Sequence, residues 1–193
     1  MTVREVALDA YREALPALVA SLFGGLLAGV VLGGMRPELR AVPGLLVLIP
    51  ALLATRGNVY GSLGARVATG LHQGLVEPHL SAADRRLGAA AAAAISNGLL
   101  ASTFASVVVF FLLTFLDSPV APLASLVGIA LVAGVLSGVV LTVVVVTVVF
   151  AGYRRGRDPD TLVGPIVTTT GDVFGVLFLL IAVRFVIGLG GVA

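Results

Sequence analysis

The sequence predicts an all-α integral membrane protein with five transmembrane helices, on the basis of its composition and of the length of its apolar segments. Of its 193 residues, 59% are hydrophobic and 11% are charged, and the mean hydropathy is +1.13. Such a chain has too few polar side chains to cover a water-soluble domain. Apolar runs of about 20 residues, the helical length that crosses a hydrocarbon core of about 30 Å, recur along it.

Composition also excludes some classes of protein. The chain contains no cysteine, which excludes a disulfide framework and a thiolate metal site. Its net charge of +2 is small and gives no support for nucleic-acid binding.

The first segment, residues 1–14, is more polar than the rest of the chain. Charged residues punctuate it at helical spacing, from Arg4 and Glu5 to Arg12 and Glu13. This pattern is typical of an amphipathic helix that lies in the membrane interface. We expect it to lie on the cytoplasmic side.

The remainder, residues 15–193, is predicted to be one transmembrane domain. Polar turns such as "MRPELR", "DSP" and "GYRRGRDPD" separate its apolar runs. The predicted spans cover about 15–34, 42–70, 87–116, 122–150 and 162–187.

The distribution of arginine predicts the orientation in the membrane. An odd number of spans places the two termini on opposite sides, and cytoplasmic connections are enriched in basic residues. One side collects Arg4, Arg12, Arg66, Arg85, Arg86, Arg154, Arg155 and Arg157, and the other collects Arg36, Arg40 and Arg184. We therefore expect a multi-pass protein of the cell membrane with a cytoplasmic amino terminus and an extracellular carboxyl terminus.

The fifth span contains an ionisable residue, Asp172. A charged side chain at the centre of a transmembrane helix costs about 2.5–3.5 kcal/mol on insertion scales, so it needs a partner, a polar cavity or a function. Residues at helical steps of three and four form a stripe of small or oxygen-bearing side chains around it. The stripe comprises Gly164, Pro165, Thr168, Asp172 and Gly175, and Thr169 adds a further hydroxyl one turn before the aspartate.

The second span carries a matching polar face. Asn58, Ser62, Ala65 and Thr69 follow one another at i, i+4, i+7 and i+11. Beside them, Gly57 and Gly61 form a small-xxx-small pair, which we expect to serve helix packing, and which is compatible with an adjacent pathway. Two polar-faced helices in one apolar protein indicate a shared polar pathway.

The available ligands favour a hard cation in such a pathway. Carboxylate, amide, hydroxyl and carbonyl oxygens without cysteine suit Mg²⁺ better than zinc or copper. Two copies of Asp172 facing a dimer axis would balance its charge, and twofold dimers are the commonest oligomers. His72, Glu77 and His79 share no helical ligand spacing, so we interpret them as part of a solvated connection.

Two stretches resemble the signatures of a known family. "IPALLATRGNVYGSLGARVATG" (49–70) resembles the second-helix motif of the MgtE-type magnesium transporters, and more closely that of the solute carrier 41 divalent-cation transporters. "DPDTLVGPIVTTTGD" (158–172) is similar to their companion motif on the fifth helix. The five-span layout agrees as well. The resemblance concerns the membrane domain only, without the cytoplasmic regulatory domains of bacterial MgtE proteins.

The resemblance implies a transporter of divalent cations and not an enzyme, with no resident cofactor. It implies a homodimer, embedded in membrane lipid, with the pathway at the subunit interface. Mg²⁺ is the expected ion, and Mn²⁺ and Co²⁺ are possible further ones. Asp172, Thr168 and Asn58 match the family's ion-site positions. The positions expected to line the pathway are Ser62, Thr69, Thr169, Gly164, Gly57 and Gly61.

Two alternative interpretations of Asp172 stay open at this point. The residue is an H⁺ or Na⁺ site of a coupled cation exchanger in the first. In the second, the chain is a non-transporting membrane subunit in which Asp172 pairs with Arg56 of the second span.

Overall fold

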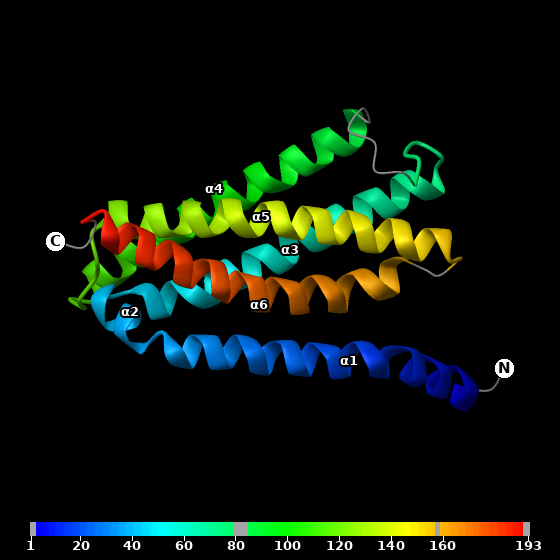
Figure 1. Cartoon of the computed structure of the whole chain (residues 1–193), viewed down its shortest axis with the longest axis horizontal. Helices are drawn as coiled ribbons and strands as arrows, with labels where there is room; N and C mark the ends of the chain where they lie inside the picture. Colours follow the sequence, from blue (N-terminus) through cyan, green and yellow to red (C-terminus); the bar gives the residue numbers. More distant parts are fainter. Residues whose placement is uncertain (1–2, 79–84, 157–158, 191–193) are drawn as a thin grey trace.

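The computed structural model describes residues 3–78, 85–156 and 159–190. Within these residues the chain forms six helices (Figure 1). They are α1 (Val3–Gly34), α2 (Arg36–Ala41), α3 (Leu45–His72), α4 (Arg85–Phe115), α5 (Leu123–Arg154) and α6 (Pro159–Gly188). The predicted all-α class is confirmed.

Four helices are long and apolar enough to cross a membrane, where five were expected. These are α3, α4, α5 and the part of α6 from Val163 to Gly188. Within the described residues, α1 contributes the shorter apolar segment Leu18–Gly34, so its crossing of the membrane stays a prediction. The predicted 1–14 helix and the predicted first span form one continuous element. The predicted polar turn after it is a short helix, α2, with Pro37 in its first turn, where proline costs no hydrogen bond.

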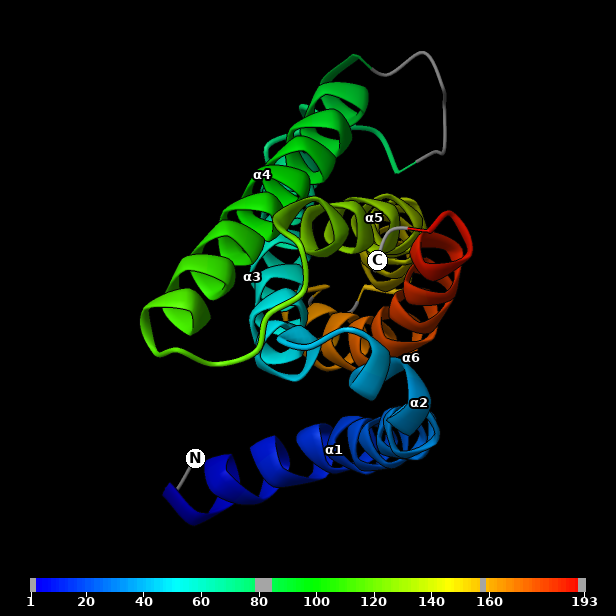
Figure 2. The ribbon, with the colours of Figure 1, turned by 90° about the vertical axis from the view of Figure 1, so that its left-hand side faces the viewer.

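The helices run lengthwise in one bundle (Figures 1 and 2). Helix α5 packs against α3, α4 and α6, and a larger share of it is buried than of any other candidate span. By contrast, α1 lies along the outside of the bundle beside α6 (Figure 2). The two termini lie at opposite ends of the bundle (Figure 1), which agrees with an odd number of passes along its length.

Glycines set the closest approaches of α6 to its neighbours. A Cβ on Gly64 of α3 would overlap Val163 Cγ1 and lie 3.3 Å from Val145 Cγ1. Similarly, a Cβ on Gly24 of α1 would overlap the methyl group of Thr169. Missing side chains let helix backbones approach closely in membrane bundles. Helix α6, which carries Asp172, is therefore held between α1 and α3.

An ion pair joins α2 to the carboxyl-terminal end of α6. Arg184 Nε donates a hydrogen bond to Glu38 Oε1 at 2.8 Å. Glu38 is buried, whereas the Arg184 side chain is 66% exposed. The hydrogen bond from Arg184 holds the pKa of Glu38 below its ordinary value. This contact ties the α1–α2 segment to the carboxyl-terminal part of the helix that bears Asp172.

Candidate functional site

The polar stripe of α6 lies on a partly open face of the helix. Gly164 and Thr168 are exposed and Asp172 is partly buried. The Thr168 hydroxyl donates to the Gly164 carbonyl at 2.8 Å, and the Thr169 hydroxyl donates to the Pro165 carbonyl at 2.7 Å. Each hydroxyl therefore keeps its lone pairs available as acceptors on this helix.

The two threonines differ in their surroundings. Thr168 shares the exposed face with Gly164, and a Cβ on Gly164 would meet nothing within 4 Å. Thr169 is partly buried, with its methyl group against Gly24 of α1. Of the two threonines, Thr168 therefore shares an open surface with Gly164, whereas Thr169 packs against α1.

Asp172 is the only acidic residue within the four candidate spans. Its carboxylate forms no ion pair with Arg56, since the ion pair found among the described residues joins Arg184 to Glu38. The expected alternative of a standing Asp172–Arg56 pair is therefore wrong for this structure. Among the described residues, no three histidine, cysteine or acidic side chains lie close enough together to hold a metal ion. Within the candidate spans, one chain therefore contributes a single carboxylate, that of Asp172.

The polar stripe of α3 lies on the outer surface of the bundle. Asn58, Ser62, Ala65 and Thr69 are all exposed. The opposite face of the helix is buried and comprises Arg56, Tyr60, Leu63, Val67 and Leu71. The predicted periodicity is confirmed, since the polar residues share the exposed side of α3 and the apolar ones its buried side.

Gly57 and Gly61 make no close helix contact among the described residues, so the packing role expected for them stays a prediction. A Cβ added at either position would meet nothing within 4 Å among the described residues. Gly64, one turn later, makes the close contact with α6 instead. Spacing alone did not distinguish these glycines, because small residues recur on more than one face of α3.

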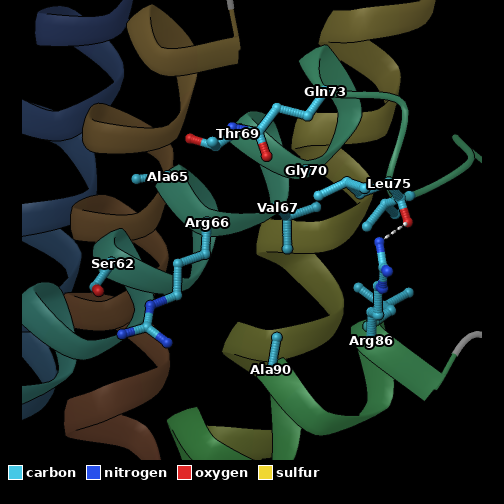
Figure 3. Close-up of a pocket in the computed structure, with 12 residues that line it drawn as sticks. Ser62, Ala65, Arg66, Val67, Thr69, Gly70, Gln73, Leu75, Arg86 and Ala90 are labelled. Carbon is cyan, nitrogen blue, oxygen red and sulfur yellow. Dashed lines mark hydrogen bonds between the residues drawn. The ribbon is translucent and has the colours of Figure 1, made fainter.

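Two adjoining cavities follow the polar stripe between α3 and α4. One has a volume of about 250 Å³, and its polar lining comprises Asn58, Ser62, Arg66 and Asn97. The other, of about 420 Å³, shares Ser62 and Arg66 and extends toward the ends of the two helices. In Figure 3, Ser62, Ala65 and Thr69 project from one side of α3, while Arg86 donates to the Leu75 carbonyl at 3.4 Å. The sequence analysis did not identify Asn97 as a lining residue. The signal that could have found it is the presence of a polar amide in the middle of an apolar span.

The two cavities beside α3 do not include the polar stripe of α6. Gly164, Thr168 and Asp172 are absent from the lining of both. On α6, Gly164 and Thr168 are exposed, whereas Asp172 is partly buried.

The structure describes part of the histidine connection. His72 and Glu77 are exposed, and the His72 ring makes an edge contact with Tyr153, with 5.6 Å between ring centroids. His79 lies outside the described residues. His72 is the last residue of α3 and Glu77 lies in the connection after it, and the interpretation as a solvated connection stays a prediction.

Comparisons with known proteins agree with the two motifs. Residues 49–182 match the model of the MgtE family, described as a divalent cation transporter. The chain is 27% identical over 172 residues to solute carrier family 41 member 2 from Homo sapiens and from Macaca fascicularis. The alignment covers 85% of this chain and 29% of each relative. No solved structure matches the chain.

The family match contains every residue of both polar stripes, since it begins within α3 and ends within α6. The resemblance identified from the motifs is thus confirmed, as is the expectation of a transporter and not an enzyme. The apolar helices and the family together make it a multi-pass membrane protein. This chain belongs to the MgtE family of divalent cation transporters.

Proposed function

We propose that this chain transports divalent cations, with Mg²⁺ as its main ion, through a pathway between two copies of the chain. Helices α3 and α6 of each copy line this pathway, and the Asp172 carboxylates of the two copies hold the ion at its centre. The amino terminus faces the cytoplasm and the carboxyl terminus faces outward. Mn²⁺ and Co²⁺ follow the same route.

The observation that carries the proposal is the position of Asp172. It is the only carboxylate within the candidate spans, and it lies partly buried on a stripe whose other members are small or hydroxylated. A carboxylate at this depth requires compensation by a positive charge or by water. Two such carboxylates balance one dication, and Mg²⁺ commonly binds through one or two carboxylates while retaining several waters.

The exposed stripe of α3 supports the pairing of two copies. Asn58 and Ser62 lie on a candidate membrane-spanning helix, and both are exposed. Polar side chains in a span generally face other helices or a water-filled path and not lipid. The open space over Gly57 and Gly61 leaves room for a hydrated ion or for a second backbone. A twofold axis beside this face would place a second copy against the polar side chains and would fill the open space over the two glycines.

Transport by purified protein in liposomes tests the ion site. Asp172→Asn keeps the side-chain volume and removes the charge, so Mg²⁺ entry reported by an enclosed indicator should fall at least about tenfold, which corresponds to about 1.4 kcal/mol. The matched control is Asp117→Asn, in the exposed loop after α4. Asp117 has a φ of 49°, which asparagine also adopts, so uptake should be unchanged. Wild-type uptake by Asp172→Asn would exclude this ion site.

Cysteine cross-linking tests the interface separately. Because the natural chain contains no cysteine, Ser62→Cys provides a single thiol on the exposed stripe. Mild oxidation in the membrane should produce a covalent dimer from Ser62→Cys. Leu100→Cys, at an exposed apolar position of α4, should remain monomeric under the same conditions. Equal cross-linking of the two variants would contradict an interface along α3.

A further inference from the structure

Arg66 places a positive charge on the exposed surface of α3, within a candidate membrane span. It lies six positions before the end of the helix at His72, which is about 9 Å along the axis. Its side chain forms no hydrogen bond or ion pair among the described residues. In Figure 3 it extends toward Ser62 and away from Thr69 and Gln73, so it points along the span and not toward the nearer helix end. A charged side chain in a span generally pairs with another group or reaches the interface, and Arg66 does neither with the described part of the chain.

The two cavities between α3 and α4 adjoin this guanidinium group. Ser62, Arg66 and Ala90 line both of them. The larger cavity also reaches Arg86, whose Nη1 donates to the Leu75 carbonyl. The described lining contains these two arginines and no acidic residue. Its other polar groups are amides and hydroxyls, which donate hydrogen bonds: Asn58, Ser62, Thr69, Gln73 and Asn97. Positive charge and donors without a carboxylate suit an anion and not a metal ion.

The cavities exist because the first turns of α4 diverge from the bundle. Figures 1 and 2 show this end of α4 pointing away from α5. In residues 85–93 no position is buried, and the buried positions of α4 begin at Ala94. Ala90 and Ala93 face the cavities, and their methyl groups leave the space unfilled. A site with small apolar walls and a charged group therefore opens between two candidate spans.

The exposed face of α4 continues from the cavities as an apolar surface. Steps of three and four relate its members, which are Arg86, Ala90, Ala93, Asn97, Leu100 and Phe104. Leu100 is 69% exposed and Phe104 is 70% exposed. From Ala90 to Leu100 the helix rises about 15 Å, which is half of a hydrocarbon core of about 30 Å and thus the depth of one leaflet. This surface suits an apolar chain attached to the anion.

We propose that the two cavities bind an anionic phospholipid, whose phosphate pairs with Arg66 and whose acyl chain lies along the exposed face of α4. In the proposed orientation this end of the bundle lies in the cytoplasmic leaflet, where anionic lipids are concentrated. Basic pockets between spanning helices on that side bind anionic headgroups in other membrane proteins. The lipid supplies the countercharge for Arg66 and fills the space between α3 and the first turns of α4.

This lipid site is separate from the proposed ion site. The cavities lie on the side of α3 that faces α4, whereas Gly57 and Gly61 line neither of them. Asp172 is also absent from both linings. Lipid binding therefore does not depend on the assignment of the ion to Asp172, and either proposal can fail alone.

Thermal stability of the purified full chain in detergent tests the ligand. The chain is titrated with dioleoyl phosphatidylglycerol, with dioleoyl phosphatidylcholine and with inorganic phosphate. At a hundredfold excess over its Kd, phosphatidylglycerol should raise the melting temperature by about 5–10 °C. Phosphatidylcholine should raise it much less, because its headgroup carries its own cation. Inorganic phosphate, which has no acyl chain, should leave it unchanged.

A charge variant tests the role of Arg66. Arg66→Gln should raise the phosphatidylglycerol concentration for half of the full shift at least about tenfold. The matched control is Arg85→Gln, since Arg85 is exposed in the first turn of α4 and lines neither cavity. This control should respond like the wild type.

A bulk variant tests the cavities without a change of charge. Ala90→Phe places a ring in the space shared by both cavities and should weaken the phosphatidylglycerol response by a similar factor. Ala89→Phe, at an exposed position outside both linings, should not. The pair keeps the test decisive if Arg66→Gln does not fold.

Several outcomes would overturn the inference. Equal shifts with phosphatidylglycerol and phosphatidylcholine would show that the headgroup charge is not recognised. A wild-type response by Arg66→Gln or by Ala90→Phe would show that the lipid binds elsewhere. A shift with inorganic phosphate as large as that with phosphatidylglycerol would assign the site to a free anion. Asp172→Asn should keep the lipid response, so loss of transport in that variant concerns the ion site alone.

Discussion

Replacing Gly64 by alanine should destabilise the bundle, whereas the same replacement at Gly61, three residues earlier on α3, should not. The two sites share a helix and a residue type but differ in their surroundings. A Cβ on Gly64 would overlap Val163 Cγ1 and approach Val145 Cγ1 to 3.3 Å, whereas one on Gly61 would meet nothing within 4 Å. Valine is stiff at χ1, so neither neighbour of Gly64 yields easily.

The expected difference in melting temperature is taken between the two variants, because the gain in helix propensity is the same in both and cancels. Both variants gain about 0.5–1 kcal/mol, because alanine favours a helix interior over glycine. Only Gly64→Ala adds the cost of overpacking, which is about 1–3 kcal/mol. One kcal/mol shifts the melting temperature by about 2–4 °C for a domain of 150–250 residues. Gly64→Ala should therefore melt at least about 2 °C, and up to about 12 °C, below Gly61→Ala.

The assay compares the two variants with the wild type in one detergent, following the helical circular dichroism signal during heating. Gly61→Ala should melt at or above the wild-type temperature, although a methyl group on the proposed pathway should slow its Mg²⁺ uptake. Equal melting temperatures for the two variants would refute the close α3–α6 contact at Gly64.

Two further predictions concern other contacts. Glu38→Gln should melt slightly below the wild type at pH 7. Because the pKa of Glu38 is lowered in the folded state, this gap should narrow as the pH falls below the ordinary value of 4.5 and Glu38 becomes protonated. The gap should be small because Arg184 is exposed. A gap that does not narrow at all as the pH is lowered below 4.5 would contradict the ion pair. Gly138→Ala should lower the melting temperature because its Cβ would lie 2.6 Å from the Tyr60 hydroxyl oxygen. Adding Tyr60→Phe should restore most of the loss. If the melting temperature does not recover, the overlap with the Tyr60 hydroxyl is not the cause.

Much of the candidate site could be predicted from periodicity. Asp172 is detectable because it is a single acidic residue in an apolar span. Its stripe is defined by helical steps of three and four. The common face of Asn58, Ser62 and Thr69 was also predicted, since residues at this spacing share one side of any α-helix. These features depend only on the local geometry of one helix.

Other features depend on which helix lies opposite, and periodicity does not contain that information. Gly57 and Gly61 share the small-xxx-small spacing of a packing motif, yet Gly64 makes the close contact with α6. The sequence left open a pair between Arg56 and Asp172, but no such ion pair forms among the described residues, and the guanidinium lies against Gly175. Asn97 became relevant only when α4 was placed beside the stripe of α3.

The sequence by itself determined the class of the protein, because burying this many apolar residues in helices requires a membrane. It also determined the family, through two motifs that carry both polar stripes. Only the tertiary structure decided that the polar residues of α3 lie beside α4, that Asp172 is partly buried, and that Arg56 lies buried against Gly175. The physical reason is that a helix face is defined by its own periodicity, whereas the partner of that face is chosen by packing between segments distant in the chain.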